Sequence, residues 1–296
     1  MKSEQTETLV SRQYKRVGLF AESWKRLRTN PGAMFGLGVL IVMTLLMIYS
    51  FLFISREQIM AIDPLNRLSP PSWQHPFGTD NMGRDLFVRT IYGTRFSLAV
   101  GFGSVAYAMV IGTFLGAIAG FYGKWVDELI LRVADVISSI PALLLGMVIV
   151  ALLGASLTNL LIAVGISVIP SFIRMTRAAV LSAKGNEYVE SAKAIGMSTF
   201  RTIFTQVLPN CISPLIVTAT ARIASSVLQA AALSFLGFGV RAPLPEWGAL
   251  VSAGRNYIRL APHITLYPGL FIMLVTFACA LLGDGLRDAL DPQLKK

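Results

Sequence analysis

Side chains that bind metals or act as nucleophiles are few in this sequence and stand far apart. Its two histidines are His75 and His263, and its two cysteines are Cys211 and Cys279. Neither pair has C-x-x-C spacing or the clustered histidine and carboxylate partners that metal sites and redox centres require. The sequence therefore predicts no metal site, and it predicts that the cysteines are small apolar packing residues.

A phosphate-binding loop of the form G-x-x-x-x-G-K-[ST] is also absent from the sequence. The pair Gly123-Lys124 lacks both the earlier glycine and the following hydroxyl residue. Without this loop, a nucleophile–base pair or a metal site, the chain should catalyse no reaction and should not hydrolyse ATP. We expect a protein that is not an enzyme and that binds no cofactor of its own.

The composition points to lipid as part of the solvent. Of 296 residues, 54% are hydrophobic and only 14% are charged, whereas a soluble domain carries about a quarter charged residues. The net charge of +10 comes from lysines and arginines that lie mostly in short breaks between apolar runs. This placement favours contact with anionic headgroups over nucleic acid, because no basic stretch is interleaved with aromatics.

Six apolar segments approach the length of about 20 residues that a helix needs to cross the hydrocarbon core. They are Ala33–Ser55, about Phe96–Tyr122, about Leu131–Leu153, Leu157–Ile173, about Ile212–Phe238 and about Leu266–Leu282. The sequence thus predicts an all-α integral membrane protein with about six transmembrane helices. With an interior N-terminus, seventeen lysines and arginines lie inside and eight outside. The positive-inside rule therefore places both termini in the cytoplasm.

The chain should divide into an N-terminal tail, residues 1–32, and a transmembrane region, residues 33–296. Within the tail, Phe20, Trp24 and Leu27 recur on one helical face, and Asn30-Pro31 ends the segment. This pattern is typical of a helix in the cytoplasmic headgroup layer, although the same face could pack on protein instead.

A long interior loop, about residues 178–211, is too large to be a simple connector. Its first helix should place Tyr188, Ala192 and Ile195 on one face and end at Gly196, where a chain can adopt positive φ. Ser198 could cap a second helix with an apolar face of Phe200, Ile203, Phe204 and Val207, closed by Leu208-Pro209. A helical hairpin with more apolar surface than it can bury is expected to dock on a partner.

These residues resemble the cytoplasmic signature of permease subunits of ATP-binding-cassette importers, which runs Glu-Ala-Ala, three residues, Gly, nine residues, Ile, one residue, Leu-Pro. The match here is Glu190-Ser191-Ala192, Gly196 and Leu208-Pro209, with Ser191 and Gln206 departing from the pattern. The resemblance implies that the loop is the coupling element that sits in a groove of an ATPase subunit. The residues it assigns to this role are Glu190, Ser191, Ala192, Ala194, Ile195, Gly196, Met197, Leu208 and Pro209.

Further motifs resemble the second, shorter permease of the dipeptide/oligopeptide/nickel family. They are His75–Asp85, Ile91–Arg95, Ser234–Gly237, Pro245–Gly248 and Gly283–Pro292. The resemblance implies a type I importer fold, a plasma-membrane location and import of di- or oligopeptides, with glutathione or a nickel chelate as alternatives. It also implies a homologous second permease, two ATPase subunits that bind ATP and Mg²⁺, and an extracytoplasmic substrate-binding protein. The residues alone leave open an ion-coupled secondary transporter, although the spans offer little acidic residue beyond Asp135 and Asp284.

Arg222 lies about ten residues into the fifth predicted span, roughly 15 Å deep at the helical rise. An intramembrane charge is costly and faces a bundle interior or a water-filled path. Arg222 could therefore line the translocation path and attract a substrate carboxylate, or form a structural ion pair with Asp135 of the third span.

Overall fold

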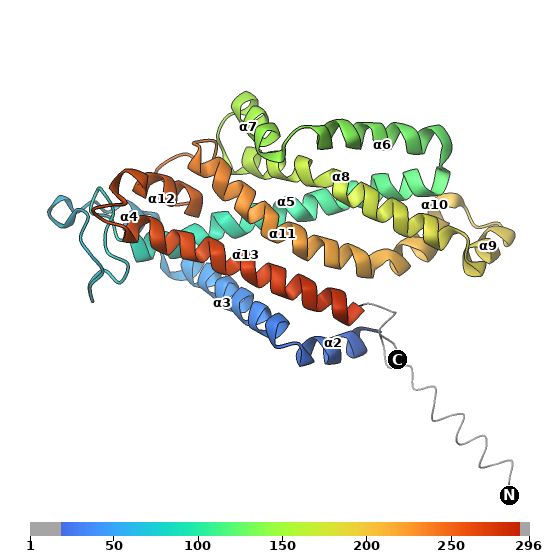
Figure 1. Cartoon of the computed structure of the whole chain (residues 1–296), viewed down its shortest axis with the longest axis horizontal. Helices are drawn as coiled ribbons and strands as arrows, with labels where there is room; N and C mark the ends of the chain where they lie inside the picture. Colours follow the sequence, from blue (N-terminus) through green and yellow to red (C-terminus); the bar gives the residue numbers. More distant parts are fainter. Residues whose placement is uncertain (1–18, 291–296) are drawn as a thin grey trace, which may run out of the picture.

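The computed structural model describes residues 19–290, and this part of the chain is helical with one isolated bridge, between Thr79 and Asp85. The helices are α2 (Leu19–Thr29), α3 (Pro31–Phe53), α4 (Arg56–Met60), η1 (Pro64–Asn66), α5 (Leu86–Tyr122), α6 (Lys124–Ser139), α7 (Ala142–Leu153), α8 (Leu157–Lys184), α9 (Glu187–Ala194), α10 (Thr199–Thr202), η2 (Ile203–Val207), η3 (Leu208–Cys211), α11 (Ile212–Phe235), α12 (Trp247–Gly254), η4 (Arg255–Tyr257) and α13 (His263–Leu290). The long helices run along one axis, with α4 and α12 at one end and α9 and α10 at the other (Figure 1).

Five helical segments are long and apolar enough to cross a membrane, and a sixth crossing arises if the bent pair α6–α7 is one span. The prediction of an all-α protein with about six spans is therefore confirmed. Several helices run past the predicted spans: α5 begins at Leu86, where the Asp85 carboxylate accepts a hydrogen bond from the Val88 amide at 2.9 Å. Such extensions are polar enough to lie beyond the hydrocarbon core, so hydropathy alone could not place their ends.

The third predicted span, Leu131–Leu153, is not one continuous helix. Helices α6 and α7 meet at an angle of 91° across Ile140 and Pro141. Proline has no amide hydrogen and disfavours the helical conformation of the residue before it. Ile140 accordingly adopts an extended conformation, with φ −93° and ψ 128°. Apolar composition continues through this break, which is why the apolar run alone predicted a single span.

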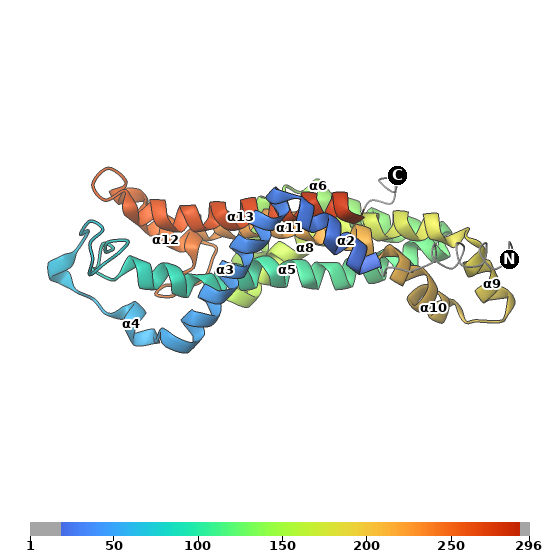
Figure 2. The same ribbon diagram turned by 90° about the horizontal axis from the view of Figure 1, so that it is seen from below.

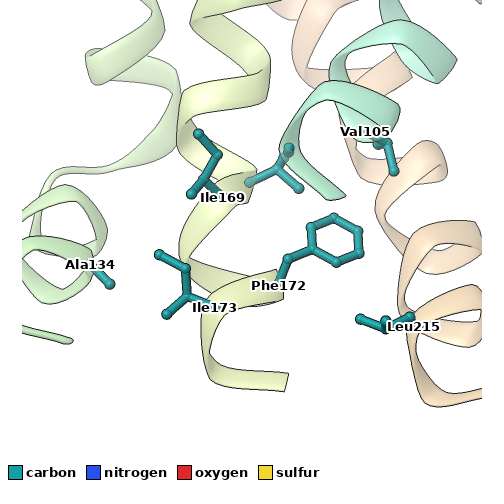
Figure 3. Packing of buried hydrophobic residues seen from close by; sticks show 8 residues of the cluster. Val105, Ala134, Ile169, Phe172, Ile173 and Leu215 are labelled. Atoms are coloured by element: carbon teal, nitrogen blue, oxygen red, sulfur yellow. The ribbon is translucent and has the colours of Figure 1, made fainter. Parts of the chain in front are cut away.

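Helices α5 and α8 pack with very close backbones. A Cβ atom added at Gly112 would lie 2.9 Å from the Ile169 carbonyl oxygen, and one added at Gly116 would lie 2.5 Å from the Ile173 carbonyl oxygen. Around this seam, Val105, Phe172 and Leu215 form part of a buried cluster that draws α11 into the same core (Figure 3). Small residues thus bring two backbones together where lipid offers no hydrophobic driving force.

Helix α3 joins the bundle mainly through α13 and α5. Along its length it packs on α13, where a Cβ added at Gly36 would lie 2.5 Å from the Ala278 carbonyl oxygen. At its carboxyl end, Arg95 of α5 donates hydrogen bonds to Ser50 Oγ at 2.6 Å and to the Ile54 carbonyl oxygen at 3.2 Å. A guanidinium at this position satisfies free carbonyls and complements the helix dipole.

The N-terminal helix is present as predicted and ends at Thr29, with Asn30 capping α3 through a 3.1 Å hydrogen bond to the Ala33 amide. Leu27 is buried with Ala289 of α13, while Trp24 stays 43% exposed. The helix therefore packs partly on protein, and its position in the headgroup layer stays a prediction. The earlier part of the predicted tail, residues 1–18, lies outside the described residues.

Candidate functional site

The loop between α8 and α11 forms a compact helical element at one end of the bundle (Figures 1 and 2). Val189, Ile203 and Val207 are buried in a cluster with Ala117 of α5 and Val180 of α8. These contacts fix the loop to the ends of the two long helices.

The Glu-Ser-Ala segment and its glycine form the exposed corner of this loop. Ala192 is buried, whereas Glu190, Ser191 and Ala194 are exposed and Ile195 is 79% exposed. Helix α9 ends in a turn in which the Met197 amide donates to the Ala192 carbonyl oxygen at 3.0 Å and Gly196 has φ +79°. On the face predicted from Tyr188, Ala192 and Ile195, Ala192 is buried whereas Ile195, which follows the last residue of α9, is exposed.

The second half of the loop differs from the predicted helix that ends at Leu208-Pro209. Helix α10 passes into a π-type turn, η2, then into the 3-10 turn η3, and from there into α11. Pro209 lies in the first turn of η3, where a missing amide hydrogen costs little. Of the predicted apolar face, Ile203 and Val207 are buried, but Phe200 and Phe204 are exposed and lie against each other, with ring centroids 4.4 Å apart.

A cavity of about 1220 Å³ lies along α11, between α8 on one side and the ends of α2 and α13 on the other. Arginine, serine, threonine and asparagine side chains line it together with aliphatic ones. The lining residues are Ser23, Arg26, Ser171, Arg174, Met175, Ala178, Asn210, Ser213, Pro214, Val217, Thr218, Ala221, Arg222, Ser225, Arg287, Ala289 and Leu290. We call this cavity the basic groove. A polar surface of this kind on membrane-spanning helices must face water or protein rather than lipid.

The structure does not bring Arg222 and Asp135 together. The Asp135 carboxylate of α6 instead pairs with Arg174 of α8, at 3.1 Å from Nη1, and Arg174 also donates to Ser138 Oγ at 2.9 Å. Arg222 is exposed in the basic groove and forms no ion pair within residues 19–290. Sequence spacing places both residues in spans, but it does not tell which way each helix turns its side chains.

At the opposite end of the bundle, a buried carboxylate organises the loop before α5. Asp80 accepts hydrogen bonds from the Met82 amide at 2.8 Å and from Arg84 Nε at 2.7 Å. Arg89, 4% exposed, lies 3.6 Å from the same carboxylate and donates to the Ile59 carbonyl oxygen at 2.8 Å. This segment is therefore held by internal hydrogen bonds.

Glu246 and Trp247 lock α12 against α5, a role that the sequence did not reveal. Ser97 Oγ donates to Glu246 Oε1 at 3.0 Å, and the Trp247 indole donates to the Thr90 carbonyl oxygen at 2.9 Å. Both side chains are fully enclosed. Burial raises the pKa of the Glu246 carboxyl, while its hydrogen bonds oppose that rise. His263 is also buried, with Nε2 3.2 Å from the Thr79 carbonyl oxygen, so it packs against the loop before α5.

Replacing Asp80 with asparagine should destabilise this end of the molecule by about 3 kcal/mol, because two largely buried arginines would lose their counter-charge. Thermal unfolding of the purified chain should show a lower midpoint. Asp63→Asn is the matched control, since Asp63 belongs to the same loop, is less buried, and accepts hydrogen bonds from the Leu65 amide and the Asn66 side chain rather than from arginines. Equal midpoints for the two variants would contradict a structural role for Asp80.

Comparison with known proteins gives one consistent result. Residues 112–296 match the family model described as the binding-protein-dependent transport system inner membrane component, and residues 18–71 match that of the N-terminal transmembrane domain of oligopeptide transport permease C. The dipeptide transport system permease protein DppC of Alkalihalophilus pseudofirmus is 46% identical, over 96% of this chain and 93% of its own. The glutathione transport system permease protein GsiD of Pectobacterium atrosepticum is 42% identical, over 93% and 91%.

Among solved structures, an inward-facing form of the MetNI methionine ABC transporter aligns with a TM-score of 0.56 at 18% identity. The alignment covers 69% of this chain and 97% of the transporter chain. At this identity the similarity concerns the fold alone. It confirms the expected type I importer architecture.

Proposed function

Because the chain belongs to the family of binding-protein-dependent transport system inner membrane components, we propose that it forms half of the translocation path of an ATP-binding-cassette importer for di- or oligopeptides. The observation that carries this proposal is the 46% identity to a dipeptide permease over nearly the whole of both chains. Family membership implies a partner permease, ATPase subunits and a substrate-binding protein. The proposed complex contains one homologous permease, two ATPases with ATP and Mg²⁺, and one extracytoplasmic binding protein.

The proposed orientation places α9 and α10 in the cytoplasm of a bacterial cell and α4 and α12 outside its inner membrane. The predicted excess of lysine and arginine on the α9 side supports this orientation. In this orientation the segment around Asp80 and the Glu246 lock face the binding protein.

The α9–Gly196 corner is the proposed docking point for an ATPase subunit. Ile195 and Phe200 are both exposed, Ala192 is buried, and Val189 packs in the cluster with α5 and α8. Two of the remaining signature elements have local positions: Glu190 lies in the first turn of α9, and Leu208-Pro209 begins the 3-10 turn that leads into α11. When ATP draws the ATPases together, movement of this corner would pass to α5 and α8.

The basic groove is proposed to be this chain's share of the path. Arg222 supports this assignment, because an exposed arginine inside a span must face water or protein. Asp135 has the structural role in this proposal, since its ion pair with Arg174 joins α6 to α8. Glutathione remains a second candidate substrate because a glutathione permease is 42% identical.

The proposal is tested by isolating the tagged chain with its natural partners and rebuilding the complex in proteoliposomes. A second permease and ATPase chains should copurify, and peptide-loaded binding protein should stimulate ATP hydrolysis and peptide uptake. An ion-coupled secondary transporter would instead accumulate peptide from an ion gradient without ATP. Uptake that needs the gradient and ignores ATP would reject the importer assignment.

A further inference from the structure

The basic groove has a one-sided charge. Four of its lining residues are arginines, and among the described residues that line it none is aspartate or glutamate. Arginine keeps its charge at any pH the cell reaches. A cavity with walls of low dielectric and charge of one sign concentrates ions of the other sign. The groove therefore favours an anionic group.

Arg222 lines the groove from within the spanning helix α11. It lies about ten residues along α11 from Ile212, roughly 15 Å from the start of that helix. Its side chain is exposed to the groove and pairs with no carboxylate of residues 19–290. Retaining an unpaired guanidinium within a span is costly unless water or a passing anion reaches it.

Arg174 supplies a second cationic group on the α8 wall of the same groove. Its contacts with Asp135 and Ser138 use two of its five N–H donors and fix the guanidinium at 3.1 Å and 2.9 Å from these partners. The remaining donors stay available, and the side chain is 45% exposed. A guanidinium held in place in this way can bind a carboxylate without first losing side-chain freedom.

The rest of the lining suits a peptide. Ser171 and Ser213 offer hydroxyl groups to the backbone groups of a ligand. Thr218, Ser225 and Asn210 donate to carbonyl oxygens of preceding residues and can still accept hydrogen bonds from a ligand through their side-chain oxygens. The volume of about 1220 Å³ exceeds the range of roughly 300–1,000 Å³ of pockets for small ligands. A short peptide could therefore pass with part of its hydration water.

We propose that Arg222, together with Arg174, forms a carboxylate station in the permease that favours substrates with a free C-terminal carboxylate. This inference rests on the proposed function as a peptide permease. It adds a second selection step after the binding protein, at a site in the membrane. A peptide whose carboxylate is converted to an amide would lose the charge-assisted hydrogen bonds that this station offers.

The test compares dialanine with dialanine amide in proteoliposomes of phosphatidylcholine that contain the whole complex. The binding protein is loaded to saturation with either compound, as judged from its intrinsic fluorescence. Because the binding protein is the same for every permease variant, the ratio of variant to wild-type rate isolates the effect of the permease. Variants are Arg222→Gln, the charge-keeping Arg222→Lys, and the control Arg132→Gln, whose side chain is 75% exposed outside the groove.

We expect Arg222→Gln to slow dialanine uptake about tenfold and to change the amide rate less than about twofold. Arg222→Lys should retain most of the dialanine rate, and Arg132→Gln should alter neither rate. Equal slowing of both compounds by Arg222→Gln would overturn the carboxylate station while leaving the permease function intact. A complex that loses its partner permease would also overturn it, by showing that Arg222 pairs across the subunit interface.

Two further results separate other causes. If the defect appears only when phosphatidylglycerol is added, the groove binds a lipid headgroup, and the station for substrate is rejected. If the wild-type complex imports neither compound with ATP, the proposed function itself fails. Each of these outcomes differs from the compound-specific defect that the station predicts.

Discussion

The Ile195→Asp variant is expected to lose ATP-driven uptake almost completely while the chain itself folds normally. Ile195 is 79% exposed beside Gly196, so its replacement removes no packing from the bundle. In the docked state, however, the aspartate would be buried against the ATPase without a partner charge. An interface anchor of this kind is worth about 2 kcal/mol or more, which corresponds to roughly a thirtyfold loss of affinity.

Two measurements separate docking from folding for this variant. Copurification of the ATPase subunits should fall, while the melting temperature of the permease should stay at the wild-type value. Ile195→Leu serves as the control, because it keeps an apolar side chain of the same size. If Ile195→Asp retains its ATPases and its uptake, the α9–Gly196 corner is not the docking point.

The Gly116→Leu variant is expected to fold into a markedly less stable protein. An added Cβ would lie 2.5 Å from the Ile173 carbonyl oxygen, and backbone atoms of α8 cannot yield as a flexible side chain would. Separating the two helices would also remove contacts around Gly112 and Gly120, which face the same backbone. Overpacking of this kind costs about 3 kcal/mol, which should lower the melting temperature by roughly 10 °C.

Gly38→Leu is the matched control for this prediction. It makes the same substitution in a spanning helix, α3, at a glycine with no atom within 4 Å of an added Cβ. Thermal unfolding in detergent and the yield of monodisperse chain provide the comparison. Similar losses in both variants would show that leucine is poorly tolerated for reasons other than the α5–α8 seam.

Apolar runs predicted most of the fold because the membrane itself sets the length of a spanning helix. The first span illustrates this: Ala33–Ser55 was predicted, and α3 covers Pro31–Phe53. The break at Pro141 was not predicted, because the apolar composition of the segment continues through it. The Ile140-Pro141 step is nevertheless itself a signal against helix. Pro209 was predicted to end a helix, but it lies in the first turn of η3. A proline in a first turn allows the following helix to begin.

The candidate site was predicted in part. The loop motif depends on local spacing, and the helix α9 and the turn at Gly196 lie where it predicted them, while the coupling role of this loop stays a prediction. The partner of Asp135 proved to be Arg174 rather than Arg222, and this choice depends on how α6 and α8 rotate about their axes. Glu246 gave no signal of burial because an acidic residue in a loop is ordinarily solvated.

The packing of α3 on α13 has a consequence for the synthesis of the protein. The first spanning helix and the last are neighbours in space, although more than 200 residues separate them in the chain. During translation, α3 is inserted before α13 has been synthesised. It therefore lacks its main partner until α13 leaves the ribosome, because contacts between distant segments form late. In a chain truncated before His263, α3 would lack α13 as its packing partner. The α3–α13 contact can therefore form only after α13 has been synthesised.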